Sequence, residues 1–150
     1  MEPNMSDPFQ NVDSAGADFA KATAKTMEVR QSEPIMERLV SNYLGKLKFK
    51  NNSLSVEIGC GAGSISRRVS KHAGAVRIIG YDPSSNYIEM AKRDSKGYEN
   101  LAFSVANGEN IPLEDGSVDN IIFHTVLSHV EKPSLLIEEA YRLLNKSGKM

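Results

Sequence analysis

The stretch that most constrains the fold is VEIGCGAG, residues 56–63, in which an apolar run gives way to three alternating glycines. The apolar run 54–58 predicts a short buried strand, and residues 64–72 predict a helix. Because glycine adopts backbone conformations that other residues avoid, we expect a tight turn at residues 59–63. A strand that turns directly into a helix is typical of α/β folds.

The rest of the sequence repeats this alternation. We expect further strands at 75–81, 101–106 and 118–124, and helices at 34–47, 83–96 and 133–144. Strands that alternate with helices predict a doubly wound α/β fold with a mainly parallel sheet. Such sheets bind ligands beyond the carboxyl ends of their strands.

Composition narrows the partners and the location. Lys and Arg number 18 against 19 Asp and Glu, so no excess positive charge attracts nucleic acid, and no nucleic-acid partner is expected. The single cysteine, Cys60, supplies neither a disulfide nor a cysteine metal site, and we predict no metal. We find no signal peptide and no apolar run of the ~18 residues that a membrane span needs. A cytoplasmic location without a membrane span is therefore expected.

The chain divides into two parts. Residues 1–30 begin with a polar stretch, so we expect a flexible N-terminal arm that contains a short helix at 18–30. Residues 31–150 are expected to form one ligand-binding domain.

The spacing of the glycines selects among nucleotide ligands. The dinucleotide pattern G-x-G-x-x-G needs glycine at position 64 or 66, where serines stand, and no P-loop lysine follows. Glu57 precedes the glycines, and its carboxylate would repel a pyrophosphate and attract a cation. S-adenosylmethionine (SAM) carries a sulfonium and an ammonium group, so it fits this charge. The alternative is a turn that binds nothing.

A second acid supports a nucleoside ligand. Asp82 ends the second expected strand, 19 residues after Gly63, close to the ~20 expected for an acid that binds ribose hydroxyls. The alternative is a helix cap, because Asp82-Pro83-Ser84 is a good capping sequence. The two roles are compatible, since the cap and the ligand site lie at the same strand end.

Taken in order, the segments VEIGCGAG, IIGYDPS, VANGENIPLEDGSVDNIIF and EEAYRLLNKSG resemble the class I SAM-dependent methyltransferases, over residues 32–150. The likeness is greatest to the branch of ubiquinone/menaquinone C-methyltransferases and other small-molecule methyltransferases. It implies a Rossmann-like fold, SAM as the methyl donor and a small-molecule acceptor. The implied cofactor-binding residues are Glu57, Gly59, Cys60, Gly61, Gly63, Asp82, Pro83, Asn107, Gly108 and His124.

One of these residues departs from the family pattern. Asn107 stands where the family commonly has Asp, at the position that binds the adenine amino group. Its amide oxygen still accepts that hydrogen bond. The alternative is a turn residue, because Asn107-Gly108 is a strong turn signal.

Two histidines are the candidate catalytic residues. His124 and His129 follow the fourth expected strand, where a general base would lie if the acceptor must lose a proton. The alternative for each is a polar residue without acid–base duty.

The resemblance also predicts what lies beyond these strands. Class I methyltransferases usually have seven strands, and NKSGK at 145–149 is expected to be only a turn. We therefore expect strands five to seven to be missing and strand four to be an unpaired edge that favours edge pairing or homo-oligomers. A SAM-binding module without activity, or a fragment, is the alternative function, and a nicotinamide-dependent oxidoreductase is disfavoured by Ser64, Ser66 and Glu57.

Overall fold

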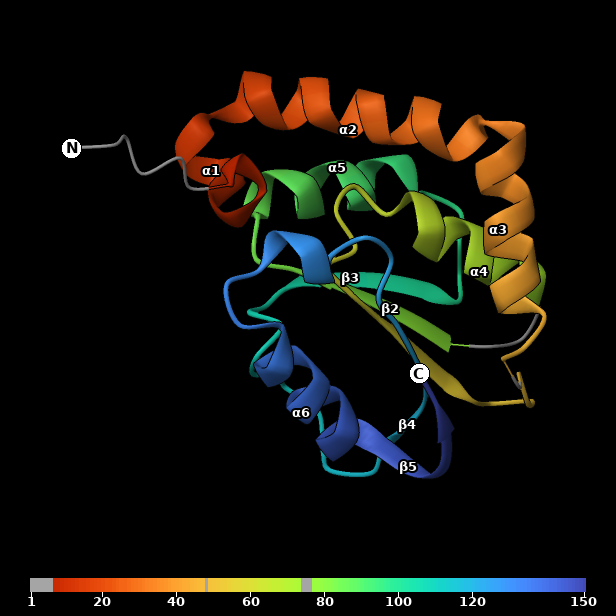
Figure 1. The fold of residues 1–150 in the computed structure, drawn as a ribbon. Helices are drawn as coiled ribbons and strands as arrows, with labels where there is room; N and C mark the ends of the chain where they lie inside the picture. Colours follow the sequence, from red (N-terminus) through yellow and green to blue (C-terminus); the bar gives the residue numbers. More distant parts are fainter. Residues whose placement is uncertain (1–6, 48, 74–76) are drawn as a thin grey trace.

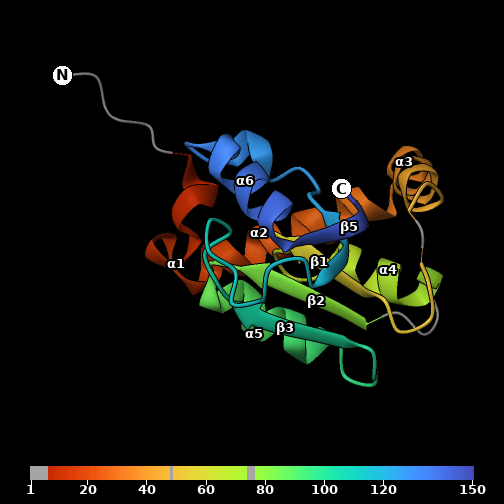
Figure 2. The ribbon, with the colours of Figure 1, turned by 90° about the horizontal axis from the view of Figure 1, so that it is seen from below.

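A single parallel sheet organises the chain. The computed structural model describes residues 7–47, 49–73 and 77–150, and within them five strands lie in the order β3-β2-β1-β4-β5 (Figures 1 and 2). All four strand pairs are parallel. The strands are β1 (Leu54–Ile58), β2 (Arg77–Asp82), β3 (Leu101–Val105), β4 (Val118–Ile122) and β5 (Leu144–Lys149). The prediction of a doubly wound α/β fold is confirmed.

Helices cover both faces of this sheet (Figure 1). The α4 and α5 side also carries α2 and α3, and α6 lies on the opposite side. The helical elements are η1 (Pro8–Asn11), α1 (Val12–Ala15), α2 (Ala17–Ser32), α3 (Pro34–Leu44), α4 (Ser64–Ala73), α5 (Ser85–Asp94), η2 (Leu127–His129) and α6 (Pro133–Leu143). No helix of the described ranges is long and apolar enough to cross a membrane.

The side chains of β1 point alternately toward the helices on the two faces of the sheet. Val56 and Ile58 are buried in the core on the α6 side, together with Leu136 and Leu143. Successive residues of a strand point to opposite faces, so Glu57 points toward α4. The sheet therefore directs a carboxyl group into the α4 layer.

The prediction that strand five is missing is wrong. β5 pairs in parallel with β4, Val118 opposite Leu144 and Asn120 opposite Lys149, with a register shift between them. Its sequence, LNKSGK, shows no apolar alternation, because most of its side chains are exposed and backbone hydrogen bonds hold it to the sheet. β4 is thus paired on both sides, and the unpaired edges of the described sheet belong to β3 and β5.

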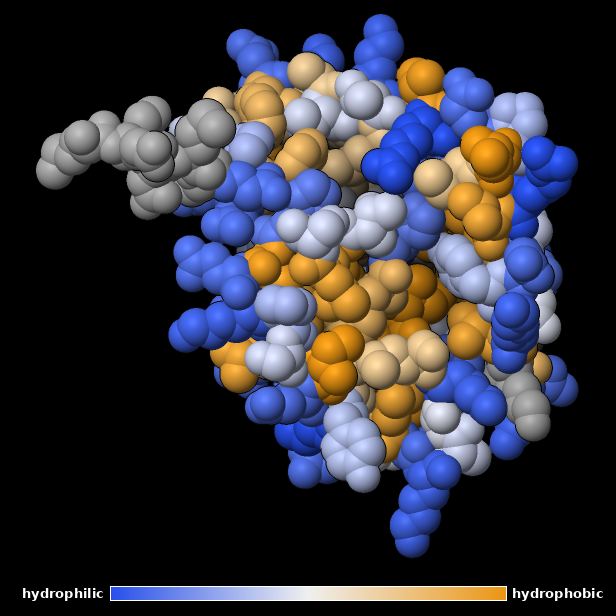
Figure 3. All heavy atoms as spheres, viewed as in Figure 1, coloured by the Kyte–Doolittle hydropathy of each residue, from blue (hydrophilic) through white to orange (hydrophobic). Residues whose placement is uncertain are grey.

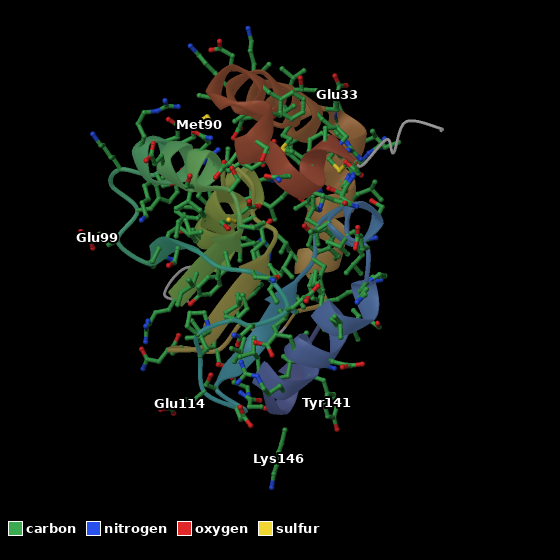
Figure 4. The ribbon with its side chains drawn as sticks, turned by 90° about the vertical axis from the view of Figure 1, so that its left-hand side faces the viewer. Glu33, Met90, Glu99, Glu114, Tyr141 and Lys146 are labelled. Atoms are coloured by element: carbon green, nitrogen blue, oxygen red, sulfur yellow. The ribbon has the colours of Figure 1, made fainter. Side chains whose placement is uncertain are left out.

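The N-terminal segment forms helices from Pro8 onward, and residues 1–6 of the expected arm lie outside the described residues. α2 is 16 residues long, and its small buried residues Ala20 and Ala24 pack with Val12, Ala62 and Tyr87. Figure 4 shows Met90, which also contacts this cluster, on the side of α5 near the N-terminal helices. Because alanines make up its buried stripe, α2 had only a weak apolar pattern in the sequence.

Apolar side chains gather in the middle of the face seen in Figure 3. A groove of about 400 Å³ lies beside β4, β5 and α3, and we call it the β4–β5 groove. Its lining residues are Tyr43, Lys46, Leu47, Ile121, Ile122, Phe123, Lys149 and Met150.

Candidate functional site

The three glycines form the turn that the sequence predicts between β1 and α4. Gly59, Gly61 and Gly63 have φ angles of 75°, 52° and 81°, which residues with a side chain rarely adopt. The amides of Gly59 and Cys60 donate hydrogen bonds to the carbonyl oxygen of Tyr81, at 2.8 and 3.0 Å. The turn is therefore tied to the end of β2.

Neighbouring side chains pack closely on this turn. A Cβ atom on Gly59 would lie 2.3 Å from Cγ2 of Val126, and one on Gly61 would lie 3.4 Å from Sδ of Met27. Val126 belongs to the segment after β4, and Met27 belongs to α2. These two segments thus lie over the glycine turn.

Asp82 joins the turn to α5. Its carboxylate accepts hydrogen bonds from the amide of Gly61 at 2.8 Å and from the amide of Ser84 at 2.9 Å. Burial raises the pKa of Asp82 to about 6, against the effect of these two hydrogen bonds. A carboxylate has about four lone-pair positions, and these amides use two of them. Asp82 thus keeps acceptor capacity at the carboxyl end of β2, as ribose binding requires.

Glu57 lies beneath the turn rather than at its surface. It is 2% exposed, and its carboxylate accepts a hydrogen bond from the hydroxyl of Ser66 on α4. Burial raises the pKa of Glu57 to about 8, although the Ser66 hydrogen bonds oppose this shift. At neutral pH the carboxyl is therefore largely protonated, and a bound cation would favour its ionisation.

This pKa shift predicts how stability depends on pH. The folded state holds the Glu57 proton more tightly than a carboxyl of ordinary pKa 4.5, so the free energy of unfolding falls as pH rises from 4.5 to about 8. We expect Glu57→Gln to remove this fall, so that its melting temperature exceeds that of the wild type increasingly toward pH 8.5. Thermal melts from pH 5 to 8.5 measure the difference, and the exposed residue Glu114 gives the control Glu114→Gln. Parallel profiles for Glu57→Gln and wild type would contradict the prediction.

The two candidate histidines have different surroundings. Nε2 of His124 lies 2.8 Å from the amide nitrogen of Gln31, and Nδ1 lies 3.2 Å from the hydroxyl of Tyr43. Burial, with smaller effects of Arg30 and Arg68, lowers the pKa of His124. His129 instead pairs through Nδ1 with Asp7 at 2.6 Å and is more than a third exposed.

The other predicted residues lie around these elements. The side chain of Cys60 is buried with Phe103 and Ile88, so its backbone alone faces the turn. Asn107 accepts a hydrogen bond from the amide of Glu109, which is the turn geometry of the alternative interpretation. Gly108 packs against Ile58 and Leu136, and Pro83 is exposed at the start of α5. No group of three or more metal-ligating side chains occurs in the part of the chain that the structure describes.

Sequence reasoning missed the contribution of the N-terminal helices. Asp13 of α1 accepts hydrogen bonds from the side chain of Ser84, from the backbone and side chain of Ser85, and from the backbone and side chain of Asn86. A carboxylate at the start of α5 is favoured by the helix dipole. These contacts span 71 to 73 residues of sequence, and no local pattern signals them.

The sheet order, the glycine turn after β1 and the buried acid at the end of β2 define a nucleoside-binding α/β domain. Residues 56–150 match the family described as "Methyltransferase domain", and the chain therefore belongs to this family. These are class I methyltransferases, and their cofactor is SAM.

Individual relatives agree with this assignment. The chain is 27% identical over 104 residues to the demethylmenaquinone methyltransferase of Staphylococcus saprophyticus, covering 69% of this chain and 45% of that protein. It is 30% identical over 105 residues to the ubiquinone/menaquinone biosynthesis C-methyltransferase of Rickettsia typhi, covering 65% of this chain and 42% of that protein. The chain thus spans less than half the length of these relatives.

A solved structure supports the fold. A putative SAM-dependent methyltransferase from Methanococcus maripaludis superposes with a TM-score of 0.72 at 23% identity, covering 88% of this chain and 60% of that chain. At this identity the likeness shows the fold alone.

Proposed function

We propose that this chain is the donor-binding part of an enzyme that transfers a methyl group from SAM to a small-molecule acceptor. The observation that carries the proposal is Asp82, a buried carboxylate with spare acceptor capacity that is joined to the glycine turn. When bound, SAM supplies an electrophilic methyl group on a sulfonium. We propose Glu57, Gly59, Cys60, Gly61, Gly63, Asp82, Pro83, Asn107, Gly108 and His124 as its binding residues.

Within this proposal, different residues bind different parts of SAM. Asp82 accepts hydrogen bonds from the ribose hydroxyls, and the backbone of residues 59–63 approaches the methionine part. Glu57 lies behind the turn and becomes ionised when a cation binds in front of it. Asn107 and Gly108 lie after β3, on the adenine side.

His124 and His129 are the proposed proton acceptors for an acceptor molecule that must be deprotonated. In the described ranges, Nε2 of His129 has no hydrogen-bond partner, whereas both ring nitrogens of His124 have one. A proton that leaves the acceptor is thus more easily taken by His129 than by His124, unless Gln31 moves. The proposal also includes three further expectations. Residues 31–150 form the SAM-binding domain, the protein is cytoplasmic, and it associates into oligomers.

Titration calorimetry with SAM, its demethylated product and NAD tests the proposal. We expect SAM and the product to bind and NAD not to bind, and binding of NAD without SAM would overturn the proposal. Incubation with methyl-labelled SAM and phenol, quinol and amine acceptors then measures transfer. Binding of SAM without transfer to any acceptor would favour the alternative, a SAM-binding module without activity.

A further inference from the structure

The β4–β5 groove has few polar groups, and none of its lining residues is acidic. Two lysines, Lys46 and Lys149, lie at its exposed parts, and Tyr43 is the remaining polar residue. The apolar lining of the groove includes Ile121 and Ile122 of β4, which pack on opposite faces of the sheet, and Phe123 just beyond β4. The groove therefore suits a small apolar molecule that carries negative charge, and its volume of about 400 Å³ lies in the usual range for small-molecule sites.

Tyr43 connects this groove to the carboxyl end of β4. It lines the groove, and its hydroxyl lies 3.2 Å from Nδ1 of His124, two residues beyond β4. His124 lies in the same segment as Val126, which packs on Gly59. The groove is thus linked through Tyr43 and His124 to the segment that covers the glycine turn.

The hydrogen bonds of His124 allow two arrangements of the protons. If the amide nitrogen of Gln31 faces Nε2, then Nε2 accepts, the ring proton lies on Nδ1, and Nδ1 donates to the oxygen of Tyr43. If the amide is turned over, Oε1 of Gln31 accepts from Nε2, and the hydroxyl of Tyr43 donates to Nδ1. Only the first arrangement leaves the hydroxyl proton of Tyr43 available to a ligand.

Tyr43 is well suited to remain a donor. Burial, with a smaller effect of Glu57, raises the pKa of Tyr43 well above its usual range. The phenol therefore stays protonated at neutral pH and offers a hydrogen bond rather than a charge.

We propose that the β4–β5 groove binds the methyl acceptor as an apolar molecule with an ionised oxygen, such as a carboxylate or phenolate, that His124 carries its ring proton on Nδ1, and that the hydroxyl of Tyr43 donates a hydrogen bond to the ionised oxygen. Lys46 and Lys149 attract its charge. His124 and Gln31 are positioning residues that orient the Tyr43 hydroxyl. This inference rests on the proposed function, and it adds that an acceptor which arrives ionised needs no general base.

Binding of simple probes without SAM tests this inference separately from methyl transfer. We expect 2-naphthoate to bind at least about 10-fold more tightly than naphthalene, because a hydrogen bond to a charged group contributes about that factor or more. Tyr43→Phe should lower the naphthoate affinity about 10-fold and leave naphthalene unchanged. The matched control is Tyr141→Phe, on α6, where Tyr141 is 83% exposed and points away from the sheet (Figure 4).

Nuclear magnetic resonance distinguishes this binding role of Tyr43 and His124 from a purely structural one. Methyl signals of Ile121, Ile122 and Met150 should shift when naphthoate is added, and nitrogen shifts should place the His124 proton on Nδ1. Gln31→Leu should lower the population of the His124 tautomer that is protonated on Nδ1. It should also lower the naphthoate affinity about 3-fold, which is less than the loss expected for Tyr43→Phe.

Several outcomes would overturn the inference: equal affinities for naphthoate and naphthalene, an unchanged naphthoate affinity in Tyr43→Phe, or a His124 proton on Nε2. If naphthoate binds as expected but no ionised acceptor is methylated, the proposed function fails and the groove remains an anion-binding site.

Discussion

Asp82→Ala should weaken SAM binding by about 100-fold or more, the largest loss that we expect from a single substitution in the site. Hydrogen bonds to a charged group contribute about 1.5–3 kcal/mol each, and two ribose hydroxyls meet this carboxylate in the proposed complex. The same substitution also frees the amides of Gly61 and Ser84, which loosens the glycine turn. Titration calorimetry with SAM measures the loss.

Two further variants make this result specific. Asp82→Asn keeps one acceptor oxygen and should lose less affinity than Asp82→Ala, which separates the charge from the geometry. Asp94→Ala removes an acid of α5 that pairs with Arg93 at the surface, and it should leave the affinity unchanged. The ribose assignment fails if Asp82→Ala, shown to be folded by its melting curve, binds SAM as the wild type does.

Gly63→Ala should lower the free energy of unfolding by about 2–5 kcal/mol. A φ angle of 81° costs a residue with a side chain about 1–2 kcal/mol, and overpacking costs about 1–3 kcal/mol more. The added Cβ would lie 2.6 Å from the ring of Phe103 on β3 and 3.2 Å from Cβ of Ala91 on α5, and both residues are buried. Chemical denaturation measures the change.

Gly97→Ala isolates the backbone part of this effect. Gly97 has a φ angle of 93°, but a Cβ there would meet no atom within 4 Å, so we expect only the smaller loss of about 1–2 kcal/mol. Adding Phe103→Leu to Gly63→Ala should recover part of the loss, because the smaller side chain gives room to the new methyl. Equal losses for Gly63→Ala and Gly97→Ala would show that packing against Phe103 contributes nothing.

The sequence predicted those parts of the fold that depend on local patterns of residues. The glycine turn, the strands β1 to β4 and the helices α4, α5 and α6 follow from periodicity and from residues that suit one conformation, such as Gly59 and Asp82. The same patterns indicated the family, which the match over residues 56–150 confirms.

What the sequence did not predict depends on contacts between distant segments. β5 has no apolar alternation, because its position at the edge of the described sheet leaves most of its side chains exposed. The buried surroundings that raise the pKa of Glu57 to about 8 come from the packing of α4 on β1, which the charge of this residue in the sequence does not indicate. The link from Gln31 through His124 to Tyr43 joins three elements and leaves no trace in the sequence order.

The contacts of Asp13 with the start of α5 also set an order of events during synthesis. The N-terminal helices leave the ribosome first, but their partners Ser84, Ser85 and Asn86 follow 71 to 73 residues later. At about 5–20 residues per second this delay lasts about 4–15 s, during which the Asp13 carboxylate lacks these partners. The buried alanines of α2 meet Ala62 before they meet Tyr87 of α5, so the contacts of the N-terminal helices with α5 are the last of these to become possible.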